Sequence, residues 1–426
     1  MKAPLQYVML AGAALQCGLG AFAAGQPAGA PPAPATPAAT TPAPEAESSA
    51  TFRAGKGQQL GVTAVSIDGV CVGELVAGVS SARMLSWHQI KSINGALAAG
   101  SQPLLANADA AWRGLARLER GDDLGAEAIL EPLAKTYRLR GGPTAAAVYA
   151  GLLRCRLGRG AQTLAIDSWV GWLAANEIAP DAGGGPAVSS WDHAEELLVG
   201  VIDPATGLAM ALPPTWLNVP AVRSLAGTDA MPSEPGPSRG EQMRDLYVQA
   251  ARFECRLPTR LRTMDPAWSE SQRLVWQIVA ARIGDEATRK DARAALQGRL
   301  RVAIPSWQEA WCRIGLGRSL LLESDDDSKR DGLLQLLAIA SREDGSDVYL
   351  TGIALAEAAA GLRARGDAVG ANLVLADLVR QYPDHPALEW EVIRPYVRGV
   401  GMTARMKPVD AEGKSEAKNE TDSADR

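Results

Sequence analysis

The segment 191–196, WDHAEE, is the one compact group of side chains in this sequence that could do acid–base chemistry. Asp192, His193 and Glu196 could supply a general acid and base pair or part of a metal site, because carboxyl and imidazole groups exchange protons under mild conditions. The alternative is the first turn of a helix, capped by Ser190 and favoured by the helix dipole. We favour the helix start and keep these three residues as the candidate catalytic set.

Other motifs for metals, cofactors and nucleophiles are missing from the sequence. The three histidines, His88, His193 and His385, form no HExxH or Cys-His spacing, which disfavours a zinc enzyme. The acidic segment 323–331 lacks the alternating ligands and the central glycine of a calcium loop, so we expect a polar turn between helices. No phosphate loop and no G-x-S-x-G turn is present. We therefore predict neither a metal nor a cofactor.

Four cysteines follow the N-terminal segment, namely Cys71, Cys155, Cys255 and Cys312. An even number permits disulfides in an exported protein, but the spacing is irregular and contains no CxxC. Buried free thiols inside helices are equally compatible with these positions. The sequence leaves both alternatives open.

The overall composition is that of a helical globular protein. Hydrophobic residues make up 47% and aromatic residues only 5% of the 426 positions, which suits closely packed helices better than a large sheet. The net charge of −5 offers no positive field for nucleic acid or anionic lipid. We expect no nucleic-acid partner.

Tryptophan is unusually frequent, with 11 residues against three phenylalanines. An aromatic groove for peptide or glycan would explain this number. Large side chains that fill gaps in an alanine-rich core explain it equally simply, and we favour that structural interpretation. Trp307 and Trp311, four positions apart, are expected on one helix face.

Both ends of the chain differ in composition from the rest. Residues 1–23 combine one lysine, an apolar run and Ala21-Phe22-Ala23, which predicts a signal peptide and an exported, periplasmic or extracellular protein. If the signal is not cut, this segment could serve as a membrane anchor. Residues 24–51, rich in alanine and proline, predict a disordered tether, and the charged residues 401–426 a disordered tail.

Residues 52–100 predict a small β module. Asp68-Gly69 separates two β-branched runs, the signal of a two-residue hairpin turn. Such a turn would pair Ile67 with Val70 and Val65 with Val72. A further strand is expected at 83–87.

Helical periodicity begins near residue 105. Ala108, Ala111, Trp112, Leu115 and Leu118 form one apolar stripe at helical spacing, which the Gly-Asp pair at 121–122 ends. We assign helical hairpins to 101–175 and 241–400, and a Gly/Pro-rich insertion to 176–240.

Two distant segments of the sequence predict the same helix. The segments 121–138, GDDLGAEAILEPLAKTYR, and 366–383, GDAVGANLVLADLVRQYP, place equivalent apolar residues at the same spacing. A second phrase, G-L-x-R-x-x-x-G, occurs at 114–121 and again at 151–158. Repetition of this kind is typical of stacked units, none of which can bury its apolar face alone.

At these residues the chain resembles tetratricopeptide-like helical repeats of an exported bacterial type. Gly114, Gly121 and Ala126 match the small residues that such hairpins place in the first helix, at the turn and in the second helix. In the late copy, Ala371 and the closing Pro383 match in the same way. The resemblance implies an irregular α-solenoid of helical hairpins, preceded by the β module.

The sequence also departs from the family pattern. Arg138 replaces the closing proline of the early copy, the usual aromatic is displaced to Trp112, and residues 268–303 lack the signature. The resemblance therefore covers 105–175 and 305–396.

Such repeats commonly bind proteins or peptides, so the resemblance implies a non-catalytic exported scaffold or interaction protein of the bacterial cell envelope. The alternative is a secreted all-α enzyme that acts on polysaccharide through Asp192, His193 and Glu196. The sequence names neither the partner nor the oligomeric state.

Overall fold

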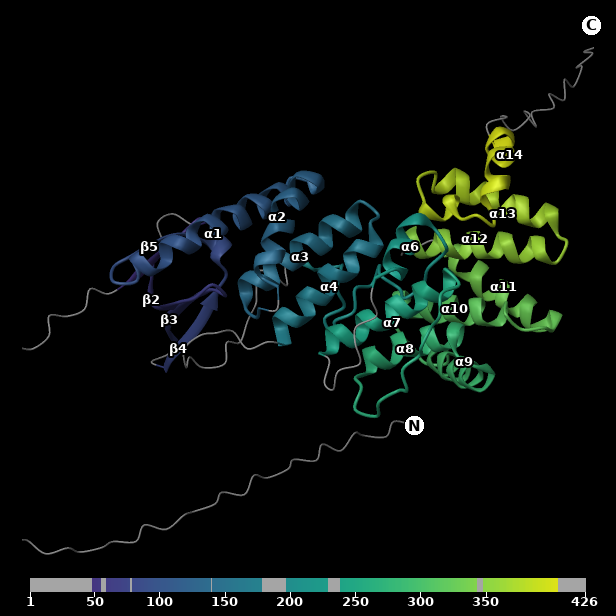
Figure 1. The fold of residues 1–426 in the computed structure, drawn as a ribbon, viewed down its shortest axis with the longest axis horizontal. Coiled ribbons are helices and arrows are strands. Elements are labelled where there is room, and N and C mark those ends of the chain that lie inside the picture. Colours follow the sequence, from purple (N-terminus) through teal and green to yellow (C-terminus); the bar gives the residue numbers. More distant parts are fainter. Residues whose placement is uncertain are drawn as a thin grey trace, which may run out of the picture. The chain divides into compact units, whose positions relative to one another are not determined.

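The structure is a computed structural model that describes residues 48–54, 59–76, 79–138, 140–177, 197–228, 238–342 and 348–404. The predicted signal peptide, nearly all of the tether and most of the C-terminal tail lie outside these ranges. Within them, 13 α-helices pack one after another and a five-stranded antiparallel sheet precedes them (Figure 1). The predicted mostly α fold with a small β module is confirmed. No helix in these ranges is long and apolar enough to span a membrane.

The sheet has the strand order β4-β3-β2-β1-β5. Its strands are β1 (Ser49–Phe52), β2 (Gln59–Val65), β3 (Val70–Val76), β4 (Val79–Leu85) and β5 (Ile90–Asn94). β1 begins inside the stretch that the sequence assigned to the tether, because Ala50 pairs with both Leu60 and Ile93 and is fully buried. The strand expected at 83–87 is present as the end of β4.

The predicted hairpin register is wrong. Val65 pairs with Val70, and the Ser66 N–H donates to the Gly69 carbonyl at 3.0 Å, so the loop has four residues rather than two. Asp68 is only 2% exposed, and its carbonyl accepts from the backbone N–H of Thr144 at 3.2 Å. A distant helix start therefore fixes this turn, which local sequence signals do not reveal.

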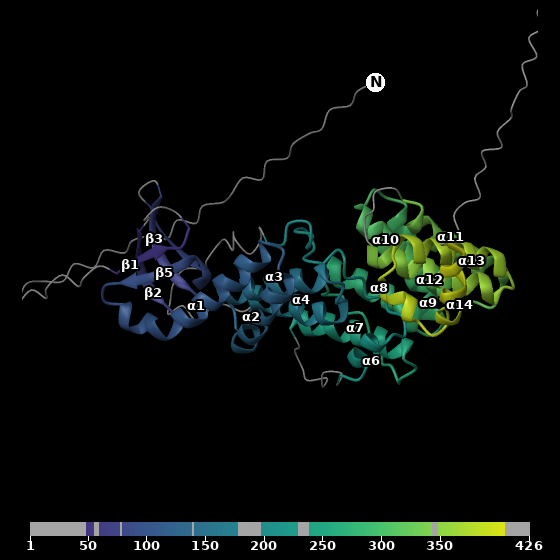
Figure 2. The same cartoon turned by 90° about the horizontal axis from the view of Figure 1, so that it is seen from above.

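One face of the sheet is covered by α1 (Ala98–Leu118), which lies beside it in both views (Figures 1 and 2). Trp87, in the short 3-10 helix η1 (Trp87–Gln89), is fully buried in this small core together with Ala108 of α1. Its indole N–H donates to the Ser66 carbonyl at 2.7 Å. Trp112, predicted on the buried stripe of α1, is 43% exposed instead, and Arg53 lies over its ring.

The helices form consecutive antiparallel contacts along the chain, each packing on the next. The first group comprises α2 (Asp123–Thr136), α3 (Pro143–Gly158), α4 (Gln162–Glu177) and the short α6 (Pro220–Ala226). The second comprises α7 (Arg239–Glu254), α8 (Glu270–Ile283), α9 (Glu286–Leu300), α10 (Ser306–Leu320), α11 (Asp326–Ala340), α12 (Val348–Ala364), α13 (Ala368–Gln381) and α14 (Arg394–Ala404), with the 3-10 helix η2 (Pro386–Glu389) before α14. α14 thus runs into the predicted tail.

The duplicated segments have the same local structure. Gly121 and Gly366 both adopt the left-handed backbone region, with φ of 76° and 86°, and each ends a helix. The next residue caps the following helix in both copies: Asp122 accepts from the Gly125 N–H and Asp367 from the Gly370 N–H. Ala126 and Ala371 are buried at equivalent positions, so the predicted repetition is real at this level.

The second repeated phrase needs a correction. Gly158, which the phrase aligns with the turn residue Gly121, is the last residue of α3. The residue that adopts the left-handed conformation in this turn is Gly160, with φ of 73°. Gly151 nevertheless has the expected packing role, since a Cβ there would lie 2.8 Å from side-chain atoms of Leu115 and Leu130.

Residues 197–219, which we call the connector, enter the core: 212–217 are buried, although Val199 and Pro204 near the start are exposed. They belong to the predicted insertion and contain little regular structure, with one isolated bridge between Ile202 and Ala209. Helix side chains donate to six of its backbone carbonyls. The donor and acceptor pairs are Trp169 to Gly207, Arg239 to Thr206, Trp311 to Met210, Tyr247 to Leu212, Tyr349 to Thr215 and Arg318 to Trp216.

Candidate binding groove

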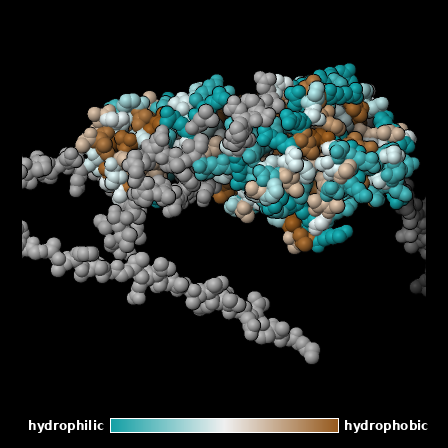
Figure 3. Space-filling view, turned by 60° about the horizontal axis from the view of Figure 1, so that its bottom comes forward, coloured by the Kyte–Doolittle hydropathy of each residue, from teal (hydrophilic) through white to brown (hydrophobic). Residues whose placement is uncertain are grey.

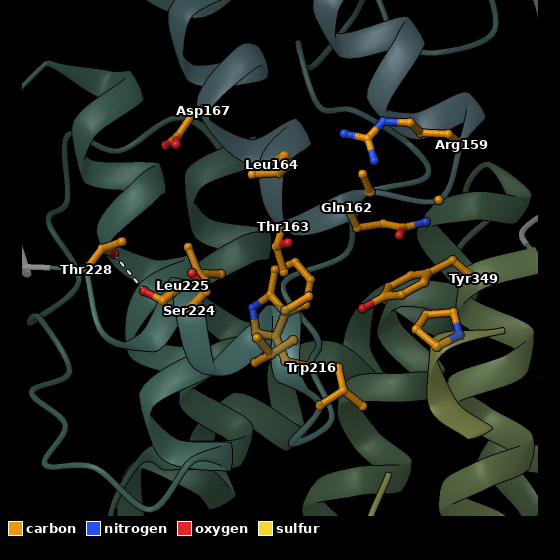
Figure 4. A pocket seen from close by; sticks show the side chains of 16 residues that line it. Arg159, Gln162, Thr163, Leu164, Asp167, Trp216, Ser224, Leu225, Thr228 and Tyr349 are labelled. Carbon is orange, nitrogen blue, oxygen red and sulfur yellow. Dashed lines mark hydrogen bonds between the residues drawn. The ribbon is translucent and has the colours of Figure 1, made fainter. Parts of the chain in front are cut away.

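A groove of about 450 Å³ lies between the first turn of α4 and helix α6, with part of the connector as its floor (Figure 4). A volume of this size is typical of small-molecule or side-chain binding sites. Figure 4 shows Arg159, Gln162 and Tyr349 at one end and Asp167 and Thr228 at the other. The two ends therefore differ in the polar groups that they offer.

The floor and walls are largely apolar. Trp216, Val219, Val222 and Leu225 are buried and line the groove from below, and Leu164 on the rim is 46% exposed. On the face drawn in Figure 3, hydrophobic residues form separate patches among hydrophilic ones. A groove with buried apolar walls is a different feature from scattered exposed apolar side chains, which are normal on protein surfaces.

Arg159 is fixed at its end of the groove by a buried ion network. Its Nε and Nη2 donate to the two carboxylate oxygens of Glu127 at 2.7 and 3.0 Å, and Arg156 donates to the same carboxylate at 2.9 Å. The hydrogen bond from Arg159 lowers the pKa of Glu127, outweighing burial, which raises it. Two arginines therefore share this one buried carboxylate.

The first turn of α4 exposes free backbone donors to the groove. α4 begins at Gln162, so its cap position is Ala161, which has no side-chain oxygen. Within the described residues, no group accepts from the backbone N–H of Gln162 or Thr163. The first N–H groups of a helix carry partial positive charge and favour an anionic or acceptor partner.

The Gln162 side chain is also without a partner. The residue is only 9% exposed and lines the groove, and Figure 4 shows its side chain extended between Arg159 and Tyr349. No hydrogen bond to its amide is formed by any residue that the structure describes. The amide itself is not among the buried side-chain groups that lack a partner, so water can reach it from the groove.

The carboxylate at the other end of the groove is already paired. The Nε of Arg244 donates to Asp167 Oδ1 at 2.9 Å. The Thr228 hydroxyl donates to the Leu225 carbonyl at 2.7 Å, as drawn in Figure 4. The first contact joins α4 to α7, and the second is local to the end of α6.

A second polar cluster lies in the core and ties four helices together. Arg318 of α10 contacts Glu357 of α12 at 2.8 Å and Glu254 of α7 at 3.1 Å, and Arg282 of α8 contacts Glu254 at 2.9 Å. Burial alone would raise the pKa of Glu254, but the two arginines lower it below its ordinary value. A cavity of about 10 Å³ beside this cluster is large enough for one water molecule at most. The cluster is therefore a packed structural element.

The candidate catalytic residues Asp192, His193 and Glu196 lie outside the described residues, as does their alternative cap Ser190. The acidic segment 323–331, expected as a polar turn between helices, is such a turn only up to Asp325. Asp325 caps α11 and accepts from the Ser328 N–H at 2.7 Å, and the rest of the segment is the first part of that helix. In the described ranges no three His, Cys, Asp or Glu residues are grouped so as to hold a metal ion.

The four cysteines named above are free thiols. Burial raises the pKa of Cys155 to about 12 and that of Cys312 to about 11, so both stay protonated at neutral pH. Of the two alternatives that the sequence left open, the structure has the free thiols.

Most tryptophans are part of the core, as favoured from the sequence. Trp307 and Trp311 share a face of α10, with their ring centroids 5.1 Å apart. Trp169, Trp216 and Trp311 are at most 1% exposed, and each indole N–H donates to a backbone carbonyl. Trp216 alone also forms part of the groove floor.

Sequence reasoning did not identify the groove. Ala161 and Gln162 belong to no recognised motif, and Trp216 and Tyr349 are far from them in the chain. One signal was present: the turn at 160–161 reads Gly-Ala where the two duplicated turns read Gly-Asp. That difference marks a helix start without its cap.

No family model matches this chain, and no curated protein and no solved structure is similar to it at a significant level.

Proposed function

We propose that this chain is a non-catalytic interaction protein, exported to the bacterial cell envelope, that binds a peptide or protein segment on its tetratricopeptide-like hairpins. The observation that supports this most directly is the groove between α4 and α6. It combines an apolar floor with unpaired hydrogen-bond donors at one end, while its carboxylate, Asp167, is paired with Arg244. Such a set of groups can hold an apolar side chain and orient a polar group beside it.

The packing of the hairpins supports the same function. Stacked helical pairs present rigid side chains on a continuous surface, and proteins of this construction use that surface for binding. Rigid walls lower the entropy lost on binding. The catalytic alternative depends on Asp192, His193 and Glu196, which lie outside the described residues.

Site-specific crosslinking in the producing cell tests this function. Ser224, exposed on the groove rim, is replaced by the photoreactive residue p-benzoylphenylalanine, and the exposed Gln297 on α9 is replaced in the same way as a matched control. We expect ultraviolet light to give a discrete protein adduct at position 224 and none at 297, recovered in the envelope fraction. Equal adducts at both positions, or none at 224, would contradict a peptide-binding groove, and recovery in the cytoplasm would contradict export.

A further inference from the structure

The two copies of the duplicated hairpin differ in what covers their second helix. In the early copy, the end of α3 packs on the first two turns of α2. Arg156 Nε donates to the carboxylate of Glu127 at 2.9 Å, and Glu127 is only 8% exposed. Gly158 is so close to the same face that a Cβ there would lie 2.8 Å from Asp123 Oδ2. The side of α2 that carries Asp123 and Glu127 is therefore a packing face for another helix.

The same side of α13 is uncovered in the late copy. Ala368 and Asn372 occupy the positions of Asp123 and Glu127, and both residues are exposed. The next helix, α14, does contact α13, but Figure 1 shows it running across α13 rather than along its first turns. Within the described part of the chain, the late hairpin thus has no neighbour in the place that α3 takes on the early one.

A large apolar side chain lies beside this uncovered side of α13. Leu373 is 65% exposed, whereas the early copy has the much smaller Ala128 at the equivalent position. Val369, one turn earlier, is 74% exposed, and its equivalent Leu124 is 70% exposed, so Leu373 is the specific difference between the copies. End units of helical arrays ordinarily present a polar outer face. The apolar strip at the start of α13 therefore favours continuation of the array by another helix.

The charged group at this face changes sides between the copies. In the early copy the carboxylate, Glu127, belongs to the hairpin, and the arginines belong to the end of α3. In the late copy the cation belongs to the hairpin: Arg363, near the end of α12, donates from Nη2 to Asn372 Oδ1 at 2.5 Å and lies over the ring of Tyr396. No carboxylate among the described residues pairs with Arg363. A covering helix that is complementary to this face would bring the carboxylate itself.

The carboxylates of α13 have partners of their own. Asp367 caps α13 at the positive end of its dipole. Asp377 accepts from Arg380 at 2.7 Å. Arg363 is therefore, in the part of the chain that the structure describes, the charged side chain of this face that still lacks a counter-charge.

We propose that the first half of α13 docks an amphipathic helix of a partner protein, which continues the helical array as α3 does behind α2. The partner helix offers a small residue to Ala368, a large apolar residue to Leu373 and a carboxylate to Arg363. These three residues are not among those that line the groove between α4 and α6. The inference therefore concerns a second surface and goes beyond the proposed peptide binding.

The chain itself offers no suitable occupant. Apart from alanine and proline, residues 405–426 contain two apolar side chains, Met406 and Val409, which is too few for an apolar helix stripe. A second copy holds its α3 against its own α2, so it cannot present that helix. The occupant is therefore a different protein with an acidic, amphipathic helix.

Helical probe peptides that differ only in the acidic group test the proposal. The probes are fluorescein-labelled peptides of about five helical turns, held helical by lactam bridges. Each carries Ala at two positions with the spacing of Gly151 and Gly158 in α3, Leu or Val between them, and Glu at the edge of this stripe. Matched probes carry Gln in place of Glu, and binding to the full chain is measured by fluorescence anisotropy. We expect a Glu probe to bind about threefold more tightly than its Gln counterpart.

Three variants locate the effect. Leu373→Asp places a charge on the apolar strip and should weaken binding of every probe about tenfold. Arg363→Gln should make the Glu and Gln probes bind equally. Leu124→Asp makes the same change as the first variant at an exposed leucine of α2, and it should bind as the unchanged protein does. The melting temperature of each variant shows that it is folded, since positions 124 and 373 are exposed.

Crosslinking in the producing cell identifies the occupant. The photoreactive residue p-benzoylphenylalanine replaces the exposed Asn372, with Gln297 on α9 as the matched control position. We expect an adduct with a different protein at 372 and none at 297. Introducing Leu373→Asp should remove this adduct.

Each outcome supports or overturns the inference. Probe binding that is sensitive to Leu373→Asp, together with the adduct at 372, supports it. An adduct of twice the mass of the chain assigns the surface to a second copy and overturns the partner. Absence of probe binding, equal binding of Glu and Gln probes, or equal loss with Leu124→Asp also overturns it. Crosslinking at Ser224 in the groove is a separate result, so the proposed function can stand when this inference fails.

Discussion

Large side chains that carry a hydrogen-bond donor pair with buried backbone carbonyls in this protein. The connector has irregular backbone in the core, where every carbonyl needs a donor. Indole, phenol and guanidinium groups provide those donors while their bodies fill space: Trp311 reaches Met210 at 3.0 Å and Tyr247 reaches Leu212 at 2.5 Å. Alanine-rich helices with only three phenylalanines leave room for such rings. Trp169 and Trp311 thus each combine core packing with a hydrogen bond to this irregular buried segment.

His385 should make the stability of the fold depend on pH. Its Nε2 lies 3.0 Å from the Tyr349 carbonyl and its Nδ1 accepts from the Ala387 N–H at 3.0 Å, so the neutral ring fills both roles. Burial lowers the pKa of His385 from 6.5 to about 4, although the hydrogen bond with Tyr349 opposes this. The unfolded chain takes up the proton first as the pH falls. Stability present above pH 6.5 is thus lost progressively down to pH 4, by about 3 kcal/mol at most.

The measurement is urea unfolding from pH 7 to pH 4 of the unchanged protein and of His385→Asn, whose side-chain oxygen can still accept from Ala387. Carboxylates that titrate in the same range contribute equally to both proteins, so the difference between the two curves isolates the histidine. We expect the variant to lose less stability as the pH falls. Parallel curves would show that His385 does not titrate as described.

At the level of elements, close helix contacts depend on the smallest side chains. Gly114 of α1 is such a position, because a Cβ there would lie 2.7 Å from the Leu130 side chain of α2. Ala126 and Ala371 fill the corresponding second-helix positions of the two copies and are at most 1% exposed. Two hairpins far apart in the chain thus use the same small residues at the same contacts.

Ala371→Leu should therefore overpack the contact between α12 and α13, with a loss of about 1–3 kcal/mol in the free energy of unfolding. The measurement is chemical and thermal denaturation. Ala126→Leu in the early copy should cause a similar loss. Ala368→Leu makes the same substitution at an exposed position of α13 and is expected to change stability by about 0.5 kcal/mol or less. Tolerance of leucine at position 371 would place this helix contact elsewhere.

The elements that the sequence predicts well are those with local signals. The helix ending at Leu118 and the Gly-Asp turn after it follow from spacing and residue type alone. The predicted hairpin register was wrong because the Asp68 carbonyl accepts from the Thr144 N–H, a contact between residues 76 positions apart. The exposed ring of Trp112 likewise has a distant neighbour, Arg53, which lies over it. The groove was beyond sequence reasoning because its two sides meet only after α6 and the connector have packed.

At the level of the whole described chain, the connector and the buried ion cluster link helices that are distant in sequence. Arg318 donates to the Trp216 carbonyl at 2.7 Å and also contacts Glu357 and Glu254. Simple repeat arrays hold together through neighbouring units alone. Here the buried ion cluster joins α7, α8, α10 and α12 to the connector, and Trp169 of α4 donates to the connector as well. These links predict unfolding as a single cooperative unit.

Arg318→Met should lower the free energy of unfolding by about 3–5 kcal/mol, because it leaves two buried carboxylates with too few partners. Guanidinium unfolding followed by tryptophan fluorescence gives the value. Arg330→Met, at an exposed position of α11, is the control and should change little. In the double variant Arg318→Met/Glu357→Met part of the loss should return. A double variant less stable than the single one would argue against an uncompensated Glu357 carboxylate as the cause.

Six carbonyls of the connector accept from side chains of particular helices, and this has a consequence for how such a protein can evolve. Arrays of helical hairpins ordinarily gain or lose whole modules by recombination, since any copy can follow any other. Here, removing a hairpin before the connector would move Trp169 away from the Gly207 carbonyl, and removing one after it would move Trp311 away from the Met210 carbonyl. The buried carbonyl would then lack a donor. We therefore expect related sequences to differ in surface residues and at their ends, but to keep the same number of helical hairpins.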